Sequence, residues 1–306
     1  MNDLLAIADL DRTELERILD LSAREDLGRP LAGQGVALVF QKPSARTRNS
    51  MEMAVAGLGG HPGYITDAAV GLASGRETPE DVARTLACFH GVIAARVFDH
   101  AVLERMAAAV DIPVLNLLSD RAHPLQTLAD LLTLRERFGR LEGLRIAYVG
   151  DGENNVARSL AAGCMRVGVS LNIAAPPEHS LSSEDLRELN SHGALTGSEV
   201  TQGVDAAEAV PGVQAVYTDT WTSMGQEDEA EARRALFAPY QVNEPLMAHA
   251  APDAVFLHCL PAHRGEEATN QVLDGPQSLI WPQARNRMRT ARGALAWMLG
   301  SAGDAA

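Results

Sequence analysis

The sequence VALVF at residues 36–40 is followed by SARTR at residues 44–48 and then by a helical pattern from Asn49 to Leu58. A short apolar run that leads through a polar loop into a helix is typical of one strand–helix unit. The loop carries two hydroxyls and two guanidiniums beside the predicted helix N-terminus, where unpaired N–H groups and the helix dipole attract anions. We therefore predict a phosphate site here. The alternative is a helix N-cap followed by solvated arginines.

The alternation of short apolar runs and helical patterns continues along the chain. The first helix follows Asp11, which forms a capping-box-like pair with Glu14. Further helices are predicted at residues 78–89, 100–108, 124–138, 155–166, 183–192 and 284–299. The predicted strands are residues 35–40, 92–97, 112–116, 144–149, 169–174, 214–218 and 254–258. Strands that alternate with helices favour parallel sheets covered on both faces, which is the α/β class.

The chain of 306 residues is longer than one hydrophobic core usually supports, so we expect two domains. Residues 137–143, which contain two glycines before a new strand, are the predicted boundary. We expect a first domain at residues 1–140 and a second at residues 141–283. A C-terminal helix at residues 284–303 is expected to pack back on the first domain.

The composition excludes several classes of protein. A formal net charge of −14 argues against sequence-independent nucleic-acid binding, which needs a basic surface. The sequence contains no apolar run near the roughly 20 residues of a membrane-spanning helix, and its N-terminus lacks a basic signal-peptide start. Cys88, Cys164 and Cys259 have no disulfide-framework or zinc-site spacing. We therefore expect a cytoplasmic protein that binds neither nucleic acid nor a membrane.

Polar clusters follow several predicted strands, where α/β proteins bind ligands. Arg96 ends the second strand, and the sequence HPLQ at residues 123–126 follows the third. Pro124 suits the first position of a helix and leaves His123 and Gln126 facing outward. Taken alone, His123 fits a hydrogen-bonded structural role better than a catalytic one.

The strand at residues 144–149 runs into the sequence GDGENN at residues 150–155. This resembles the start of a dinucleotide-binding fingerprint, but Asn155 stands in place of the third glycine. The strand at residues 169–174 also does not end in the expected acidic residue. The two adjacent amides are better suited to a carboxylate or amide group of a small substrate.

Two more clusters follow the last two predicted strands. Asp219, at the start of a short polar loop, suits a bound ammonium group, and an Asx-type turn is the alternative. Cys259 is flanked by His258, His263 and Arg264, a setting that favours a thiolate. An inert packed thiol is the alternative, and no cysteine-protease signature surrounds the residue.

Four motifs occur together in a distinctive order: SARTR at 44–48, HPLQ at 123–126, DTWTSMG at 219–225 and HCLP at 258–261. With them the chain resembles the aspartate/ornithine carbamoyltransferase family over essentially its whole length. The first two motifs are those of the whole family. The Ser-Met-Gly and His-Cys-Leu-Pro elements are similar to those of its ornithine branch.

The resemblance implies transfer of a carbamoyl group from carbamoyl phosphate to the δ-amine of L-ornithine, which gives L-citrulline and phosphate. It implies two α/β domains that close over the substrates, with carbamoyl phosphate bound by the first and ornithine by the second. It also implies a homotrimer, or stacked trimers, with sites at subunit contacts. No metal or organic cofactor is implied.

The resemblance assigns roles to the residues that match the family's motifs. Those implied to bind carbamoyl phosphate are Ser44, Ala45, Arg46, Thr47, Arg48, Arg96, His123, Gln126, Cys259, Leu260 and Arg287. Those implied to bind ornithine are Asn155, Asp219, Ser223 and Met224. The implied catalytic residues are Arg46, Arg96, His123, Gln126, Asp219 and Cys259. Their implied roles are to polarise the carbamoyl carbonyl, to receive the phosphate or to favour the neutral amine.

The sequence departs from the ornithine branch in three places. Leu125 stands where cysteine is common, and Ala45 stands where threonine is frequent, which removes one hydroxyl donor. The loop at residues 70–77 lacks a glutamine that often reaches the carbamoyl phosphate of a neighbouring subunit. Ser74 or Arg76 is the candidate replacement.

Related functions of the same fold stay open as alternatives. The acceptor amine can be putrescine, lysine, aspartate or an acetylated ornithine, or the chain can be a catalytically silent relative that binds metabolites. Aspartate carries a second carboxylate, which Asp219 disfavours. Putrescine has no α-carboxylate, so the group predicted to bind one at Asn155 would have no function. Retention of the expected arginines, His123 and Gln126 argues against a silent relative.

Overall fold

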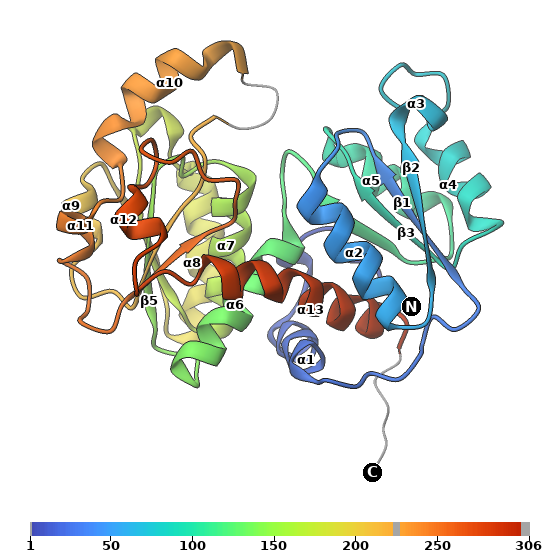
Figure 1. Cartoon of the computed structure of the whole chain (residues 1–306), viewed down its shortest axis with the longest axis horizontal. Helices are drawn as coiled ribbons and strands as arrows, with labels where there is room; N and C mark the ends of the chain where they lie inside the picture. Colours follow the sequence, from blue (N-terminus) through green and yellow to red (C-terminus); the bar gives the residue numbers. More distant parts are fainter. Residues whose placement is uncertain (1, 223–226, 301–306) are drawn as a thin grey trace. The chain divides into compact units, whose positions relative to one another are not determined.

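The computed structural model describes residues 2–222 and 227–300. It contains two parallel sheets, each flanked by helices, which confirms the predicted α/β class (Figure 1). Among the described residues, none of the helices is both long enough and apolar enough to cross a membrane.

The chain divides into two compact units, Met1–Leu132 with Asn286–Ala306, and Thr133–Arg285. Both changes of unit fall inside helices, α6 (Pro124–Phe138) and α13 (Ile280–Met298). The sequence placed the corresponding boundaries in the glycine-containing segment before residue 144 and just before residue 284. A helix that continues from one unit into the next leaves no break in composition to find.

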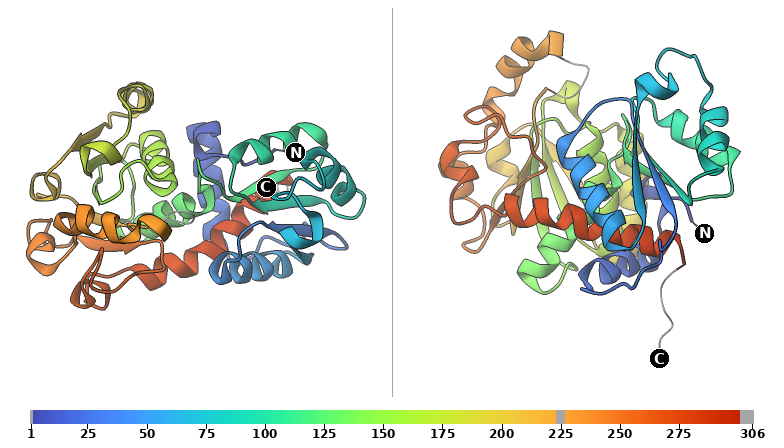
Figure 2. Two further views of the ribbon diagram at one scale, coloured as in Figure 1. Left: turned by 90° about the horizontal axis from the view of Figure 1, so that it is seen from above. Right: turned by 45° about the vertical axis from the view of Figure 1, so that its right-hand side comes forward.

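The first unit is built on the sheet β2-β1-β3-β4, in which every pair of neighbours is parallel. Its strands are β1 (Gly35–Phe40), β2 (His61–Thr66), β3 (Val92–Arg96) and β4 (Val114–Leu118). Its other helices are α1 (Arg12–Ala23), α2 (Ala45–Gly57), α3 (Asp67–Val70), α4 (Pro79–Ala87) and α5 (His100–Ala109). Helix α2 lies on one face of the sheet, and α4 and α5 lie on the other (Figures 1 and 2).

The second unit is built on the parallel sheet β7-β6-β5-β8-β9. Its strands are β5 (Arg145–Val149), β6 (Ser170–Ala174), β7 (Val200–Gly203), β8 (Ala215–Thr218) and β9 (Val255–His258). Its other helices are α7 (Asn155–Val167), α8 (Ser183–Thr196), α9 (Ala206–Ala209), α10 (Ala230–Phe237), α11 (Glu244–Met247) and α12 (Asn270–Leu273). A buried cluster that includes Trp221, Phe237 and Phe256 packs against one face of this sheet.

All seven predicted strands are present, but β2 and β7 were not predicted. Both are edge strands of their sheets. Strand β2 begins with His61-Pro62-Gly63, and β7 has only Val200 buried, so neither shows the apolar run of a central strand. The short helices α3, α9, α11 and α12 and the helix α10 were also not predicted.

The prediction that the helix after β1 starts at Asn49 is wrong, because α2 starts at Ala45. Ser44 is its N-cap, and the Ser44 hydroxyl accepts the Thr47 N–H at 3.4 Å. Arg46, Thr47 and Arg48 therefore lie in the first turn of the helix and not in a loop before it. The predicted cap of α1 is confirmed, since Asp11 and Glu14 bond reciprocally to each other's backbone N–H.

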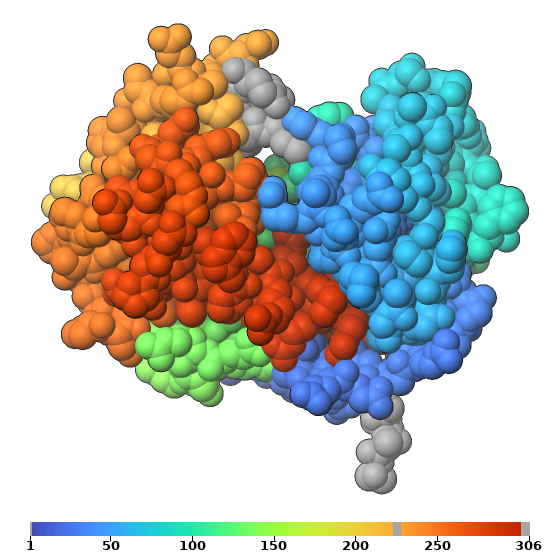
Figure 3. All heavy atoms as spheres, in the orientation of Figure 1, coloured from blue at the N-terminus to red at the C-terminus, as the bar shows by residue number. Residues whose placement is uncertain are grey.

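The C-terminal helix α13 packs back on the first unit, as predicted. The Arg292 guanidinium donates to the carbonyls of Arg24 and Glu25, and Asn2 N–H donates to the Met298 carbonyl at 3.2 Å. The helix starts at Ile280, earlier than predicted, because Pro282 lies in its first turn, where no intrahelical donor is needed. Trp281 and Pro282 in its first turn are exposed, whereas most residues from Thr290 to Met298 are buried; Figure 3 shows part of this helix at the surface.

Gly293 is the residue through which α13 approaches α1 closely. A Cβ atom at Gly293 would lie 2.1 Å from the Ser22 Oγ and 2.8 Å from the Ile18 carbonyl oxygen. We expect Gly293→Ala to lower the free energy of unfolding by about 1–3 kcal/mol through overpacking. The measurement is the urea midpoint of unfolding. Gly57→Ala is the matched control, because its Cβ would meet only Arg292 Cδ at an ordinary 3.6 Å; equal midpoints for the two variants would contradict this view of the contact.

Candidate active site

The predicted site residues fall into one group in each unit. The first-unit group, at the carboxyl ends of strands or on α2, α6 and α13, is Ser44, Ala45, Arg46, Thr47, Arg48, Arg96, His123, Gln126 and Arg287. The second-unit group is Asn155, Asp219, Cys259 and Leu260. The predicted residues Ser223 and Met224 lie outside the described residues.

Thr47 joins the start of α2 to the end of β3. Phe40 pairs with Arg96 in the parallel register of β1 and β3, so the two strands end side by side. The Thr47 Oγ1 accepts from the Ser44 hydroxyl at 3.2 Å and from Arg96 Nη1 at 3.4 Å. Arg96 is only 7% exposed, so its charge lies largely out of water at a helix N-terminus. This arrangement suits a bound anion.

Arg46 and Arg48 have different surroundings, although they are two residues apart. Both are exposed on α2, but residues two apart on a helix point to different sides. Arg48 Nε donates to Glu52 at 2.8 Å, and its guanidinium lies 3.9 Å from the centre of the Tyr64 ring. The structure therefore brings Ser44, Thr47 and Arg96 together, while Arg48 bonds along its own helix.

Gln126 is the centre of a buried hydrogen-bonded set at the start of α6. Its Oε1 accepts from Arg287 Nη1 at 2.6 Å, and its Nε2 donates to Asp130 Oδ1 at 2.7 Å. The sequence-based expectation that His123 and Gln126 face outward is wrong, because they are 5% and 1% exposed. The first turns of α6 carry Leu125, Leu128 and other apolar residues around the helix, so this end is buried on all sides.

The His123 imidazole is held in its neutral form. Burial lowers its pKa well below the usual 6.5, and the nearby charges of Arg287, Arg96 and Arg46 lower it further. A neutral imidazole among guanidiniums can donate one hydrogen bond without adding a fourth positive charge. This is the form suited to polarising a carbonyl oxygen.

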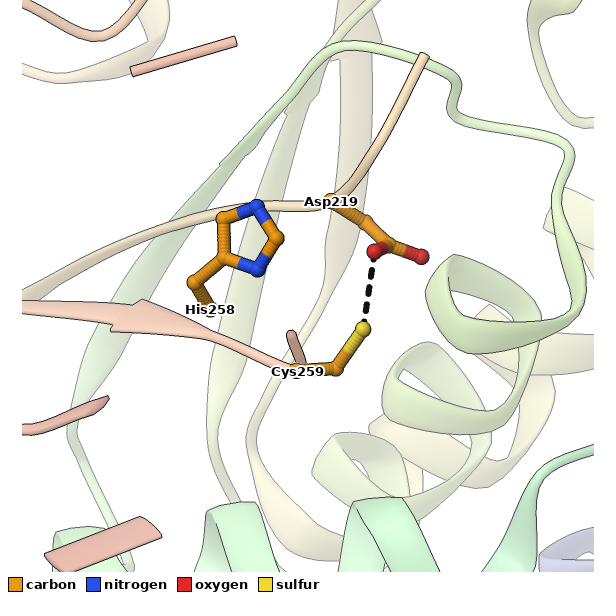
Figure 4. Close-up of side chains that lie close together, drawn as sticks. All are labelled: Asp219, His258 and Cys259. Carbon is orange, nitrogen blue, oxygen red and sulfur yellow. Dashed lines mark hydrogen bonds between the residues drawn. The ribbon is translucent and has the colours of Figure 1, made fainter. Parts of the chain in front are cut away.

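Asp219 and Cys259 meet at the carboxyl ends of β8 and β9. Thr218 pairs with His258, so the next residue of each strand emerges at the same edge. The Cys259 thiol donates to Asp219 Oδ1 at 2.8 Å, as Figure 4 shows. Burial raises the pKa of the Asp219 carboxyl, and His258 and the Cys259 hydrogen bond oppose that rise.

The expectation of a thiolate-favouring, electropositive setting for Cys259 is wrong. Its hydrogen-bond partner is a carboxylate, which favours the protonated thiol. The Arg264 guanidinium is paired with Asp274 at 2.6 Å, and the His263 ring bonds to the Thr220 hydroxyl. The arrangement is not that of a cysteine nucleophile.

His258 and Glu267 hold the backbone that follows Cys259. His258 Nδ1 accepts the Leu260 N–H at 2.9 Å, so the ring proton lies on Nε2, which bonds to Glu267 Oε1 at 3.1 Å. Glu267 is fully buried. Leu260 has a φ of +60°, a strained value for a residue with a side chain, and its N–H hydrogen bond to His258 supports this conformation. Sequence reasoning missed Glu267, because nothing local distinguishes it from a surface glutamate.

Asn155 is the first residue of α7, and its neighbour Asn154 caps that helix. Asn154 Oδ1 accepts the Ala157 N–H at 2.8 Å, and its Nδ2 donates to the Tyr148 hydroxyl at 2.9 Å. Burial and the nearby Asp219 raise the pKa of Tyr148 well above 10, so the hydroxyl stays neutral. The Asn154 amide is therefore used within the fold.

A buried ion pair that the sequence did not reveal lies beside Trp221, two residues after Asp219. The Arg233 guanidinium, on α10, pairs with the Asp151 carboxylate, and both side chains are about 5% exposed or less. Arg233 Nε also donates to the carbonyl of Trp221. Because 82 residues separate the two partners, no local pattern predicts their contact.

Three groups of described side chains lie close enough to share a cation: Asp219 with His258 and Cys259, Asp151 with Glu153 and His179, and His263 with Glu266 and Glu267. In the first group, the thiol proton is directed at Asp219 and His258 Nδ1 accepts a backbone N–H. A metal there would have to displace both bonds, so the donor set fits a hydrogen-bonded site better than a metal site.

Comparison with known proteins gives matches along the whole chain. Residues 2–136 match the family model for the aspartate/ornithine carbamoyltransferase carbamoyl-P binding domain, and residues 142–298 match that for the Asp/Orn binding domain. The chain is 45% identical over 305 residues to an ornithine carbamoyltransferase of Hyperthermus butylicus, with 97% of each covered.

Two solved structures are similar in fold and sequence. The ornithine carbamoyltransferase of Pyrococcus furiosus matches with a TM-score of 0.93 and 42% identity, covering 98% of this chain and 97% of that one. An N-acetyl-L-ornithine transcarbamylase variant matches with a TM-score of 0.86 and 28% identity, covering 97% of this chain and 99% of that one.

The lowered pKa of His123 predicts that this residue does not titrate near its ordinary value of 6.5. The unfolded chain binds this proton more tightly than the folded chain does. The stability linked to His123 is therefore fully present above pH 6.5 and is lost as pH falls below that value. Imidazole nitrogen NMR, assigned by comparison with His123→Asn, should show a neutral ring at pH 6. A titration midpoint at or above 6.5 would contradict the environment described here.

Proposed function

Because the chain belongs to the aspartate/ornithine carbamoyltransferase family, we propose that it transfers the carbamoyl group of carbamoyl phosphate to the δ-amine of L-ornithine, releasing L-citrulline and phosphate. The observation that carries this proposal is the similarity to a named ornithine carbamoyltransferase over 97% of both chains. The two groups of site residues have the charges that such a reaction needs.

The first-unit group is proposed to bind carbamoyl phosphate, in a domain that corresponds to residues 1–140 with the C-terminal helix. The N-terminus of α2, with Ser44, Ala45, Arg46, Thr47 and Arg48, would receive the phosphate, together with Arg96. The carbamoyl end would lie at His123, Gln126 and Arg287. Neutral His123 would donate to the carbonyl oxygen as negative charge develops on it.

The second-unit group, in the domain proposed for residues 141–283, is proposed to bind ornithine. Asn155, Asp219, Ser223 and Met224 would hold the α-amino and carboxylate groups. Desolvation beside Asp219 and Cys259 would favour the neutral form of the reacting amine, because an alkylammonium with a pKa of about 10 has no lone pair for attack. The Leu260 carbonyl and Cys259 would contact the reacting groups.

The chemistry follows from these roles. The neutral δ-amine attacks the carbamoyl carbon, a C–N bond forms, and the C–O bond to phosphate breaks. The phosphate keeps the electron pair of the broken bond and takes up the proton that the attacking nitrogen loses. Holding the two substrates close together and correctly oriented supplies much of the rate enhancement. The arginines stabilise the departing phosphate.

We also propose a homotrimer, or stacked trimers, in the cytoplasm, following the family resemblance. The loop expected to act on a neighbouring subunit bonds within itself in the single chain. The Ser74 hydroxyl donates to the Gly71 carbonyl at 3.0 Å, and the Arg76 guanidinium donates to the Ala69 carbonyl. Either side chain would have to give up that bond to reach another subunit.

An amine panel tests the proposed function. The purified protein is incubated with carbamoyl phosphate and L-ornithine, N-acetyl-L-ornithine, L-lysine, putrescine or L-aspartate, and ureido product and phosphate are quantified. We expect equal amounts of both products and a kcat/KM for L-ornithine that exceeds every other amine by at least about 100-fold, since unmatched buried polar groups are costly. A different preferred amine would reassign the acceptor, and absence of turnover with all five would refute transfer.

Arg46 supplies a second prediction, because a lost charge-assisted contact to the phosphate weakens transition-state binding. We expect Arg46→Ala to lower kcat/KM by about 100- to 1,000-fold, equivalent to about 3–4 kcal/mol. Arg84→Ala is the matched control, since Arg84 is exposed on α4 and pairs only weakly with Asp81 at 3.6 Å. A near-wild-type rate for Arg46→Ala would remove this residue from the mechanism.

A further inference from the structure

We propose that Asp130 is a positioning residue that fixes the orientation of the Gln126 side-chain amide, so that the site prefers a carbamoyl group over an acyl group. This inference rests on the proposed function, because it concerns the same carbamoyl phosphate site.

The geometry places Asp130 directly against the Gln126 amide. The two residues are four apart on α6 and therefore share one side of the helix. Gln126 Nε2 donates to Asp130 Oδ1 at 2.7 Å, and Asp130 is 0% exposed. A buried carboxylate is costly unless it is bonded, so this contact is strongly constrained.

The partners of Gln126 on its two sides demand the same orientation. The carboxylate of Asp130 accepts hydrogen bonds only, and it therefore requires the amide nitrogen. The Arg287 guanidinium donates only, and it requires the amide oxygen, to which it bonds at 2.6 Å. Rotation of the amide by half a turn would set oxygen against carboxylate and N–H against guanidinium. Asp130 and Arg287 together thus fix an orientation that a glutamine alone does not have.

The fixed orientation supplies an acceptor in a site that is rich in donors. Gln126 bonds directly to Arg287, and Arg287, Arg96 and Arg46 all lie near enough to His123 to lower its pKa. The guanidiniums suit phosphate and carbonyl oxygens, but they carry no acceptor for an NH₂ group. A carbamoyl group differs from an acetyl group only in having that NH₂ in place of CH₃. Gln126 Oε1, with one lone pair on Arg287, has a second lone pair with which it can accept from the carbamoyl NH₂.

The selectivity follows from the cost of an unpaired buried acceptor. A site built to bond a substrate N–H rejects an analogue that lacks it, because the acceptor then stays unpaired. If the amide could rotate, Nε2 would face the substrate and the advantage of NH₂ over CH₃ would disappear. Asp130 acts through Gln126 and does not itself touch the reacting group.

The test compares carbamoyl phosphate with acetyl phosphate, whose difference isolates the NH₂ group. In wild-type protein and in Asp130→Asn, one measures the KM for carbamoyl phosphate and the inhibition constants of acetyl phosphate and inorganic phosphate. Asparagine has the same shape but both donates and accepts, so it no longer dictates the amide orientation. We expect the ratio of the acetyl phosphate constant to the carbamoyl phosphate KM to fall about tenfold or more. The inhibition constant of inorganic phosphate should stay within about twofold, since the phosphate contacts remain.

A merely structural role gives a different result. If Asp130 only stabilises the fold, all three constants rise together and the ratio is unchanged, which overturns the inference. Thr127→Val is the matched control, because Thr127 is buried on the same helix and its hydroxyl makes no hydrogen bond within the described residues. We expect it to leave the ratio unchanged. If wild-type protein does not use carbamoyl phosphate, the proposed function fails; if it does and the ratio does not move in Asp130→Asn, only the role of Asp130 fails.

A measurement on the wild-type protein covers the case in which Asp130→Asn does not fold. Of the two side-chain amide protons of Gln126, assigned by comparison with Gln126→Met, the one bonded to Asp130 should be shifted downfield of the ordinary glutamine range and slow to exchange with water. Two protons at ordinary glutamine shifts that exchange rapidly with water would show that Asp130 does not hold the amide, and would overturn the inference.

Discussion

The parallel pairing of neighbouring strands is the constraint on which both groups of site residues depend. Adjacent strands of a parallel sheet end at the same edge, so residues far apart in sequence emerge side by side. The pairing of Phe40 with Arg96 brings the capped N-terminus of α2 to a buried guanidinium. The pairing of Thr218 with His258 brings the Asp219 carboxylate to the Cys259 thiol. In each unit the register of two strands creates a contact that neither strand specifies alone.

Burial then decides which of these polar groups carry charge. The guanidiniums stay charged because their proton affinity is too high for burial to remove. The His123 imidazole does not, and its pKa falls well below 6.5 because burial and the neighbouring arginines act in the same direction. The first group is therefore cationic around one neutral donor, which suits a phosphate joined to a carbonyl. The second group centres on a carboxylate bonded by a thiol, which suits an ammonium group.

The sequence predicts the parts of the fold that carry their own local signal. Central strands such as β1 and β3 are continuous apolar runs, because both faces of a parallel sheet are buried. The edge strands β2 and β7 have no such run, and their pairing depends on neighbours that are distant in sequence. The start of α2 was misplaced because Arg46 and Arg48 interrupt the apolar pattern. The helix starts directly after Ser44, because the Ser44 side chain caps it by accepting the Thr47 N–H, a contact that the apolar pattern does not reveal.

The site residues divide in the same way. Motifs show the side chains expected to contact substrates, such as His123, Gln126 and Cys259. They do not show Asp130, which accepts from Gln126, or Glu267, which bonds to the His258 ring next to Cys259. Both are fully buried carboxylates, and both act as acceptors that select one of two forms of a partner. Glu267 selects the His258 tautomer with its proton on Nε2.

Each carboxylate fixes one polar atom of its partner side chain and thereby determines what the other polar atom of that side chain can do. Because His258 donates its Nε2 proton in a hydrogen bond to Glu267, its Nδ1 can accept the Leu260 N–H and support a strained backbone. Because Gln126 Nε2 donates to Asp130, Gln126 Oε1 is placed to accept from Arg287. A two-sided polar group transmits a constraint in this way, because fixing one side as donor leaves the other as acceptor. Acidic residues that read as surface positions in the sequence can thus determine the hydrogen-bonding pattern that the motif residues present to a substrate.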